Sequence, residues 1–237
     1  MTHHDIHILA VCTRCPRKKS FWGDNMTDAA TEMKSQGWSD SLCPDCKPPQ
    51  AVKKNCDAKQ VYDRLYSEGY PEGNPLMVLS TFAYDLNMSC LDLGCGNAGV
   101  ASMFREYAGV DVSSVAINRA EIAYPESTFY EANLTALPAE VFDEPFDLVL
   151  CCDVMEHLPT QDVNPALKSM AAIDAQKFAF GISCRDSDYK DHLGRSLHLT
   201  IWKPHWWLNA FEQHFRVTRF LFNEDFLIIE ALKPTAE

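Results

Sequence analysis

The chain has 237 residues, of which 46% are hydrophobic and 23% charged, so it can bury one large core and still carry a small additional module. No apolar run approaches the ~20 residues of a membrane-spanning helix, and the first residues lack the basic patch and long apolar stretch of a signal peptide. These properties argue against a membrane partner and predict a cytoplasmic protein.

The net charge of −12 lies almost entirely in the larger, C-terminal part of the chain. Residues 1–68 hold ten Lys and Arg against nine Asp and Glu, whereas the rest holds eleven against twenty-four. Because an acidic surface repels polyphosphate, we do not expect an extended nucleic-acid interface on this larger part. The basic cluster of the N-terminal part, Arg14, Arg17, Lys18 and Lys19, is either a docking surface for nucleic acid or an acidic protein, or a solvated face.

Two Cys-x-x-Cys pairs lie near the N-terminus, Cys12 with Cys15 and Cys43 with Cys46. In a cytoplasmic chain such pairs more often bind metal than form disulfides. Four thiolates can surround one Zn²⁺ tetrahedrally at about 2.3 Å, and such a closed set is structural because it leaves no coordination position open for chemistry. We predict a structural zinc site here; redox pairs or a disulfide are the alternatives.

The zinc module is expected to span residues 1–55, with a strand over residues 17–22 and a helix from about residue 25 or 27 to residue 36. Its apolar residues are too few for a core that folds alone, so bound zinc is expected to supply much of the folding free energy. Residues 56–237 form the predicted main domain.

The main domain is organised around a glycine-rich stretch that follows a short apolar strand, Cys90–Leu93. Gly94, Gly96 and Gly99 have the G-x-G-x-x-G spacing, and we expect a helix over residues 100–107 directly after them. Glycines allow a sharp turn and a close approach of ligand to backbone, and the N–H groups at a helix start attract polar or anionic oxygens. The stretch therefore predicts a ligand-binding corner.

Strands and helices alternate around this corner, which is typical of a parallel sheet with helices on both faces. The other expected strands are residues 109–112, 128–132, 146–152 and 177–184, and the expected helices include residues 59–68, 76–86 and 115–123. The last two strands, 215–221 and 226–232, are joined by a tight turn and are expected to pair antiparallel. The predicted fold class is α/β, doubly wound.

Acidic positions next to the predicted strands narrow the choice of ligand. Asp92 precedes the first glycine by two residues, Asp111 ends the next strand, and Phe146–Pro159 contains an F-D-x-V segment followed by E-H-L. This set resembles the class I S-adenosylmethionine-dependent methyltransferases over residues 62–233. The resemblance implies a seven-stranded, mostly parallel sheet with an antiparallel last strand, and S-adenosylmethionine as cofactor. Dinucleotide-binding Rossmann folds share the glycine spacing, but the final hairpin and the lack of a second substrate domain favour a methyltransferase.

The resemblance also implies which residues meet the methionine half of the cofactor. The loop with its three glycines supplies backbone contacts around Gly94, Cys95 and Gly96, and Asp92 orients the ammonium group directly or through water. Cys152, at the end of the strand 146–152, lies opposite the methyl group. Tyr62 can place an aromatic face near the sulfonium cation; core packing of Tyr62 is the alternative.

The nucleoside half is assigned in the same way. Asp111 accepts the hydroxyl hydrogens of the ribose, and Val112 covers a face of the adenine. Asn133 and Leu134 lie along the adenine edge, where Asn133 can donate to a ring nitrogen and accept from the exocyclic amine.

The methyl acceptor is expected beyond the carboxyl ends of the strands, near Asp153, His157 and His198. A general base is needed only if the acceptor is a protonated hydroxyl or ammonium, and His157 is then the first candidate and His198 the second. Each histidine can instead be structural. Trp202, Trp206 and Trp207 can stack on a planar acceptor or form a buried helix face, and we expect two of the three in the core.

The acceptor itself is inferred mainly by elimination. The residues after the strand 146–152 are not the N/D-P-P-Y/F loop of enzymes that methylate exocyclic amines of bases or glutamine, and no Pro-Cys pair for cytosine or uracil C5 chemistry is present. An oxygen or nitrogen atom of a small molecule is favoured. An RNA- or DNA-modifying enzyme guided by the zinc module, and a non-catalytic interaction protein on the same scaffold, are the alternatives.

Overall fold

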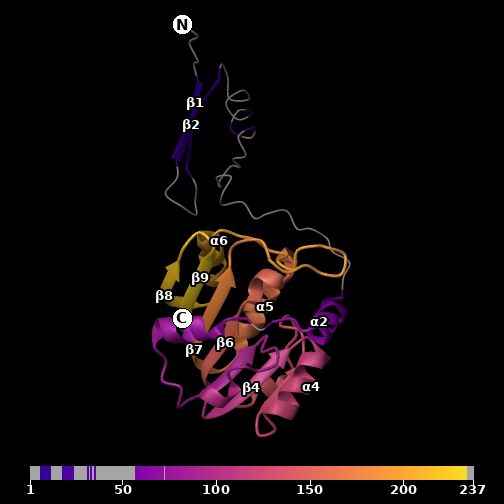
Figure 1. The fold of residues 1–237 in the computed structure, drawn as a ribbon. Helices are drawn as coiled ribbons and strands as arrows, with labels where there is room; N and C mark the ends of the chain where they lie inside the picture. Colours follow the sequence, from indigo (N-terminus) through magenta and orange to yellow (C-terminus); the bar gives the residue numbers. More distant parts are fainter. Residues whose placement is uncertain are drawn as a thin grey trace. The chain divides into compact units, whose positions relative to one another are not determined.

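A computed structural model of the protein describes residues 6–11, 18–23, 31, 33, 35, 57–71 and 73–233 (Figure 1). The chain divides into two compact units, Met1–Pro49 and Gln50–Glu237. The cysteines of the predicted zinc site, Cys12, Cys15, Cys43 and Cys46, lie outside the described residues, so the zinc module stays a prediction. Within the described residues, none of the helices combines the length and the apolar character needed to cross a bilayer.

The described part of the first unit contains an antiparallel pair of strands, β1 (Ile6–Val11) and β2 (Lys18–Gly23). The sequence predicted the second of these strands and missed the first. Thr31, Met33 and Ser35 are helical, in agreement with the helix expected in this region.

The second unit is built on a seven-stranded sheet with the order β5-β4-β3-β6-β7-β9-β8. Its strands are β3 (Ser89–Leu93), β4 (Glu106–Asp111), β5 (Thr128–Glu131), β6 (Phe146–Cys152), β7 (Ala175–Ser183), β8 (Arg216–Phe222) and β9 (Phe226–Leu232). Strands β3 to β7 pair in parallel, whereas β9 lies antiparallel to both of its neighbours, β7 and β8. The predicted α/β fold with an antiparallel last strand is confirmed.

Helices cover both faces of the sheet. One face packs against α3 (Pro75–Phe82) and α4 (Ser114–Ala123), and the other against α5 (Thr160–Ala172) and α6 (Pro204–Phe211). Alternate residues of a strand enter different cores: Leu148 and Leu150 face the first pair of helices, and Val149 and Cys151 face the second. Since both faces are covered, most residues of the central strands β3 and β6 are apolar, and Asp92 in β3 is a buried polar exception.

The three tryptophans near α6 are all core residues. Trp202, Trp206 and Trp207 belong to the core beneath α5 and α6, and the Trp207 side chain is fully buried. The expectation of two core residues was therefore too low by one, and stacking on an acceptor is not their role.

The helix expected over residues 100–107 is wrong. The glycine loop is followed only by the 3₁₀ turn η2 (Ala101–Met103), and Phe104 is already extended at φ −101° and ψ 153°. The side chains of Phe104 and Tyr107 are buried, so packing draws this segment into the sheet, and β4 begins at Glu106. Tertiary packing here overrides the local helical preference.

Two further helices frame the site. Helix α2 (Ala58–Ser67) matches the prediction for residues 59–68 within one residue at each end. Helix α3 is shorter than the predicted 76–86, because Ala83 takes a left-handed conformation at φ +51° and ends it. Figure 1 shows α2 and the loop after β7 at the same edge of the sheet.

Candidate functional site

A cavity of about 600 Å³ lies where the parallel strands end. Its walls come from the glycine loop, the segments after β4, β5 and β6, helix α2, and the loop after β7. The members of the predicted site that line it are Tyr62, Gly94, Asp111, Val112, Asn133, Leu134, Cys152, Asp153, His157 and His198. The carboxyl edge of a parallel sheet is where open α/β folds bind ligands.

The glycine loop is closely covered by two side chains. Gly94 has φ +82° and Gly96 has φ +53°. A Cβ atom at Gly94 would lie 2.3 Å from a methyl carbon of Val154, and one at Gly96 would lie 2.7 Å from the Tyr66 hydroxyl oxygen. At Gly94 both the backbone conformation and the contact with Val154 require glycine, whereas a side chain at Gly96 would have to displace the Tyr66 hydroxyl.

Asp111 is the central polar residue of the cavity wall next to the glycine loop. Its side chain is buried, and the N–H groups of Gly96 and Ser113 donate to its two carboxylate oxygens at 3.0 and 2.8 Å. Burial raises the pKa of Asp111, and these N–H groups offset part of that rise. Each oxygen retains a further lone pair, so the carboxylate can also accept hydrogen bonds from a ligand in the cavity.

The predicted adenine-binding residues lie next to Asp111. Val112, Leu134 and Asn133 line the cavity together, and Leu134 is buried. The Asn133 side-chain oxygen accepts hydrogen bonds from the backbone N–H and the hydroxyl of Thr135, both at 2.9 Å. This leaves the amide N–H groups for a ligand, so Asn133 can donate to a ring nitrogen but is less suited to accept from an exocyclic amine.

Helix α2 forms one side of the cavity and is fastened to α4. The Asp63 carboxylate accepts hydrogen bonds from the Ser113 hydroxyl at 2.8 Å and from the Val115 N–H at 3.2 Å, and so caps the start of α4. Arg119 donates to the backbone oxygen of Tyr66 at 2.7 Å. The sequence analysis missed both contacts, because no local pattern connects residues so far apart in the chain. They hold Tyr66 beside the glycine loop and Tyr62 beside His157.

Four residues of the predicted cofactor set lie outside the cavity lining: Asp92, Cys95, Gly96 and Gly99. The Asp92 carboxylate is buried and accepts a hydrogen bond from the Tyr107 hydroxyl at 2.8 Å. The Cys95 sulfur is directed toward Gly109, where an added Cβ atom would lie 2.7 Å from it. The side chains of Asp92 and Cys95 therefore support the glycine loop from beneath. For all four residues, contact with a cofactor stays a prediction.

The opposite end of the cavity begins after β6. Cys152 is buried, and Asp153 has an uncommon positive φ of +55°. The backbone N–H of Asn74 donates to the Asp153 carboxylate at 2.8 Å. Burial raises the pKa of Asp153, while this hydrogen bond lowers it.

The 3₁₀ turn η4 (Met155–His157) carries two further titratable groups. Glu156 is fully buried, and burial together with the nearby Asp153 raises its pKa to about 8. The Nδ1 atom of His157 lies 2.7 Å from the Tyr62 hydroxyl and 3.2 Å from the Leu197 carbonyl oxygen. Burial lowers the pKa of His157 to about 3, so this histidine is neutral and a weak base.

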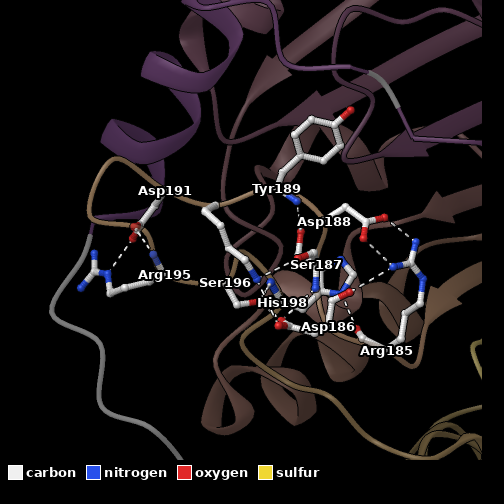
Figure 2. Close-up of polar contacts among 10 residues, drawn as sticks. Arg185, Asp186, Ser187, Asp188, Tyr189, Asp191, Arg195, Ser196 and His198 are labelled. Atoms are coloured by element: carbon white, nitrogen blue, oxygen red, sulfur yellow. Dashed lines mark hydrogen bonds and ion pairs between the residues drawn. The ribbon is translucent and has the colours of Figure 1, made fainter.

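His198 is carried by the loop after β7, which is braced by ion pairs (Figure 2). Arg185 pairs with Asp188 at 2.7 Å, and Arg195 pairs with Asp191 at 2.6 Å. Nδ1 of His198 donates to the Arg185 carbonyl oxygen at 2.6 Å, so Nε2 is the unprotonated nitrogen in the neutral ring. Burial lowers the pKa of His198 as well.

The same loop touches the segment after α2. The rings of Tyr189 and Tyr70 meet edge to face with centroids 5.4 Å apart, and Tyr70 also meets the ring of Tyr62 at 6.1 Å. Aromatic contacts of this kind link the two walls of the cavity.

The central part of the second unit matches a known protein family. Residues 90–175, from β3 to the start of β7, match a family described as a methyltransferase domain. No curated protein matches the chain in sequence.

Solved structures share the fold at low sequence identity. The complex of DhpI with SAH has a TM-score of 0.59 and 16% identity, over 75% of this chain and 95% of that one. The magnesium protoporphyrin IX methyltransferase ChlM from Synechocystis PCC 6803, with bound SAM, has a TM-score of 0.53 and 16% identity, over 77% of this chain and 100% of that one. The cyclase SpnF has a TM-score of 0.54 and 15% identity, over 77% of this chain and 85% of that one. The chain thus has the fold of SAM-dependent methyltransferases, and the fold alone does not decide the reaction.

Proposed function

We propose that this protein transfers a methyl group from S-adenosylmethionine (SAM) to an oxygen or nitrogen atom of a small molecule. The observation that carries the proposal is the position of Asp111, a buried carboxylate held by the N–H groups of Gly96 and Ser113 at the wall of the cavity. The methyltransferase-domain match over residues 90–175 covers this wall and supports the same reaction class.

The residues present suit this cofactor. A carboxylate at the end of β4 can accept both ribose hydroxyls, and the apolar side chains of Val112 and Leu134 form a slot for a flat base. Gly94 contributes backbone atoms to the cavity lining, which the methionine part can approach, and the ring of Tyr62 can face a sulfonium cation. When bound, SAM supplies a methyl group already activated by its leaving group, so the protein must position the acceptor and exclude water.

A small acceptor suits the other end of the cavity. About 600 Å³ must hold both cofactor and acceptor, which leaves little room for a polymer. Among the described residues, six aspartates but a single arginine, Arg185, and no lysine line the cavity. Such a wall repels phosphate groups and favours a neutral or cationic acceptor.

The chain's own residues would position this acceptor. Asp153 and His198 face the cavity after β6 and β7, and Tyr70 with Tyr189 joins its two walls and limits access of water. His198, with Nε2 unprotonated, is a better candidate than His157 to take a proton from the acceptor, because the pKa of His157 is lowered to about 3.

The experiment is a transfer assay with methyl-labelled SAM and three cell fractions: small molecules, nucleic acids and proteins. We expect label in the small-molecule fraction, and none when Asp111→Ala replaces the wild-type protein. Label in nucleic acid, lost at raised salt, would support the alternative of an enzyme guided by the predicted zinc module. Tight cofactor binding without label in any fraction would support the non-catalytic alternative.

A further inference from the structure

Glu156, His157 and His198 form a compact group at the acceptor end of the cavity. Each offers one ligand atom, and these three atoms all lie within 4.8 Å of one another. The turn η4 and the loop after β7 bring the residues together, and the rings of His157 and His198 stand edge to face with centroids 4.8 Å apart. One carboxylate oxygen and two imidazole nitrogens are a common ligand set for divalent first-row transition metals.

The Glu156 carboxylate is incompletely paired. Its side chain is fully buried, and the Ser183 N–H donates to Oε1 at 2.7 Å. The other oxygen, Oε2, is buried and has no hydrogen-bond partner among the described residues. Because an unpaired buried carboxylate oxygen is costly, a bound cation is a plain way to compensate it.

The two histidines are oriented as metal ligands usually are. Nδ1 of His198 donates to the Arg185 carbonyl oxygen, and Nδ1 of His157 lies within reach of the Leu197 carbonyl oxygen. Metal-ligating histidines typically donate their second ring N–H to a carbonyl or carboxylate, which fixes the tautomer and the ring orientation. Nδ1 of His157 also lies 2.7 Å from the Tyr62 hydroxyl. With both Nδ1 atoms so engaged, the Nε2 atoms are the ones left to bind an ion. An ion on Nε2 of His198 would replace the role of this nitrogen as a proton acceptor.

We infer that Glu156, His157 and His198 bind one divalent first-row transition-metal ion. Ligand atoms within 4.8 Å of one another would need side-chain rotations to reach the about 2.0–2.2 Å bond lengths of such an ion. Three protein ligands leave at least one coordination position open, and His157 and His198 line the cavity. That position suits an oxygen atom of the acceptor, so the site narrows the proposed function, on which this last step rests, to acceptors with a coordinating oxygen.

The test is a Co²⁺ titration of the full-length, EDTA-dialysed protein, followed by visible absorption. Cobalt bound by nitrogen and oxygen shows only weak bands in the visible, whereas cobalt bound by thiolates adds intense charge-transfer bands, so any cysteine site is recorded separately. We expect about one equivalent bound without those bands. We also expect His198→Ala to weaken this binding at least tenfold, as removal of a ligand should.

Two further variants make the outcome decisive. Glu156→Gln keeps an oxygen for the Ser183 N–H but removes the charge, and should weaken Co²⁺ binding to a similar extent. His214 bonds with Asn164 outside the cavity, so His214→Ala should bind Co²⁺ within about twofold of wild type. Circular dichroism checks that each variant is folded. The inference is overturned if wild type shows no nitrogen- and oxygen-bound cobalt, or if folded His198→Ala and Glu156→Gln bind it as wild type does.

Calorimetry with S-adenosylhomocysteine (SAH), the demethylated cofactor, separates this inference from the proposed function. If Co²⁺ binds at this site but SAH does not bind, the metal site stands and the methyltransferase proposal fails. If SAH binds but Co²⁺ does not, the metal inference alone fails.

Discussion

The two ends of the cavity are built in different ways. At the proposed cofactor end, backbone atoms dominate: the N–H groups of Gly96 and Ser113 hold Asp111, and Gly94 lines the cavity with its backbone. At the acceptor end, side chains dominate, with Glu156 and His198 meeting from separate segments. The cofactor end depends on backbone shape, so few amino acids are tolerated at its positions. The acceptor end depends on charged side chains, which can be substituted without altering the fold.

This difference bears on what each end can do. A site built from backbone atoms suits a ligand that is the same whatever the acceptor, since its contacts need only glycines and one carboxylate. A side-chain site on a loop after β7 can be altered residue by residue, which is how one fold serves many acceptors. We therefore expect substitutions at the cofactor end to affect folding and binding more than substitutions at the acceptor end.

The largest effect is expected for Gly94→Ala. A Cβ atom there meets Val154 at 2.3 Å and the backbone has φ +82°, so the free energy of unfolding should fall by about 3–5 kcal/mol. Gly194→Ala, in the loop after β7, is the matched control, because its φ is +73° but nothing lies within 4 Å of an added Cβ. It should cost only about 1–2 kcal/mol. Urea unfolding measures both, and equal losses would contradict the comparison.

A smaller effect is expected for Asp63→Ala, which removes one of the two contacts between helix α2 and α4 and leaves the Arg119 bond in place. Loss of the bonds from Ser113 and Val115 should lower the free energy of unfolding by about 1–2 kcal/mol. Because α2 carries Tyr62 and Tyr66, the affinity for SAH should fall roughly three- to tenfold, about 1 kcal/mol. Glu68→Ala is the control, since within the described residues the Glu68 side chain pairs with Arg64 alone, in an exposed bridge at the end of the same helix. If calorimetry finds the same SAH affinity for Asp63→Ala and Glu68→Ala, α2 does not contribute to the binding site.

The Asp63 contribution should also depend on pH. Partial burial raises the pKa of Asp63, but hydrogen bonds from Ser113 and Val115 and the ammonium of Lys59 outweigh it, so the pKa lies below its ordinary value of 3.8. The ionised group therefore stabilises the folded state above that value, and this contribution is lost as pH falls through the lowered pKa. The stability difference between wild type and Asp63→Ala should be largest near pH 7 and shrink below about pH 4. A difference that grows in acid would contradict this sign.

The smallest effect is expected at the acceptor end, for Asp188→Asn. The pair of Asp188 with Arg185 is short at 2.7 Å, but the Asp188 side chain is 70% exposed, and solvent screens such pairs (Figure 2). The free energy of unfolding should stay within the error of a urea titration, and SAH affinity should change less than twofold. A loss as large as that of Asp63→Ala would show that the two ends do not differ as described.

Sequence patterns predicted the sheet and the meeting of Gly94 and Asp111 at one cavity wall, because both follow local rules. Apolar runs mark β3 and β6, and glycines with a following carboxylate mark the corner at Gly94 and Asp111. The helix after Gly99 was predicted wrongly, because the burial of Phe104 and Tyr107 decides that segment.

At the acceptor end, the sequence predicted individual residues but not their arrangement as a group. His157 and His198 were identified singly, but their meeting with a half-paired Glu156 depends on how the loop after β7 folds back. No local spacing encodes such a contact. The anchoring of α2 through Asp63 escaped prediction for the same reason.

The most direct test of the account is calorimetry of SAH binding to wild type and to Asp111→Ala. The account predicts one SAH per chain in the micromolar range for wild type, and at least ~100-fold weaker binding for the folded variant, since two charge-assisted hydrogen bonds to the ribose are lost. Absence of binding to wild type, or equal affinity for both proteins, would contradict it.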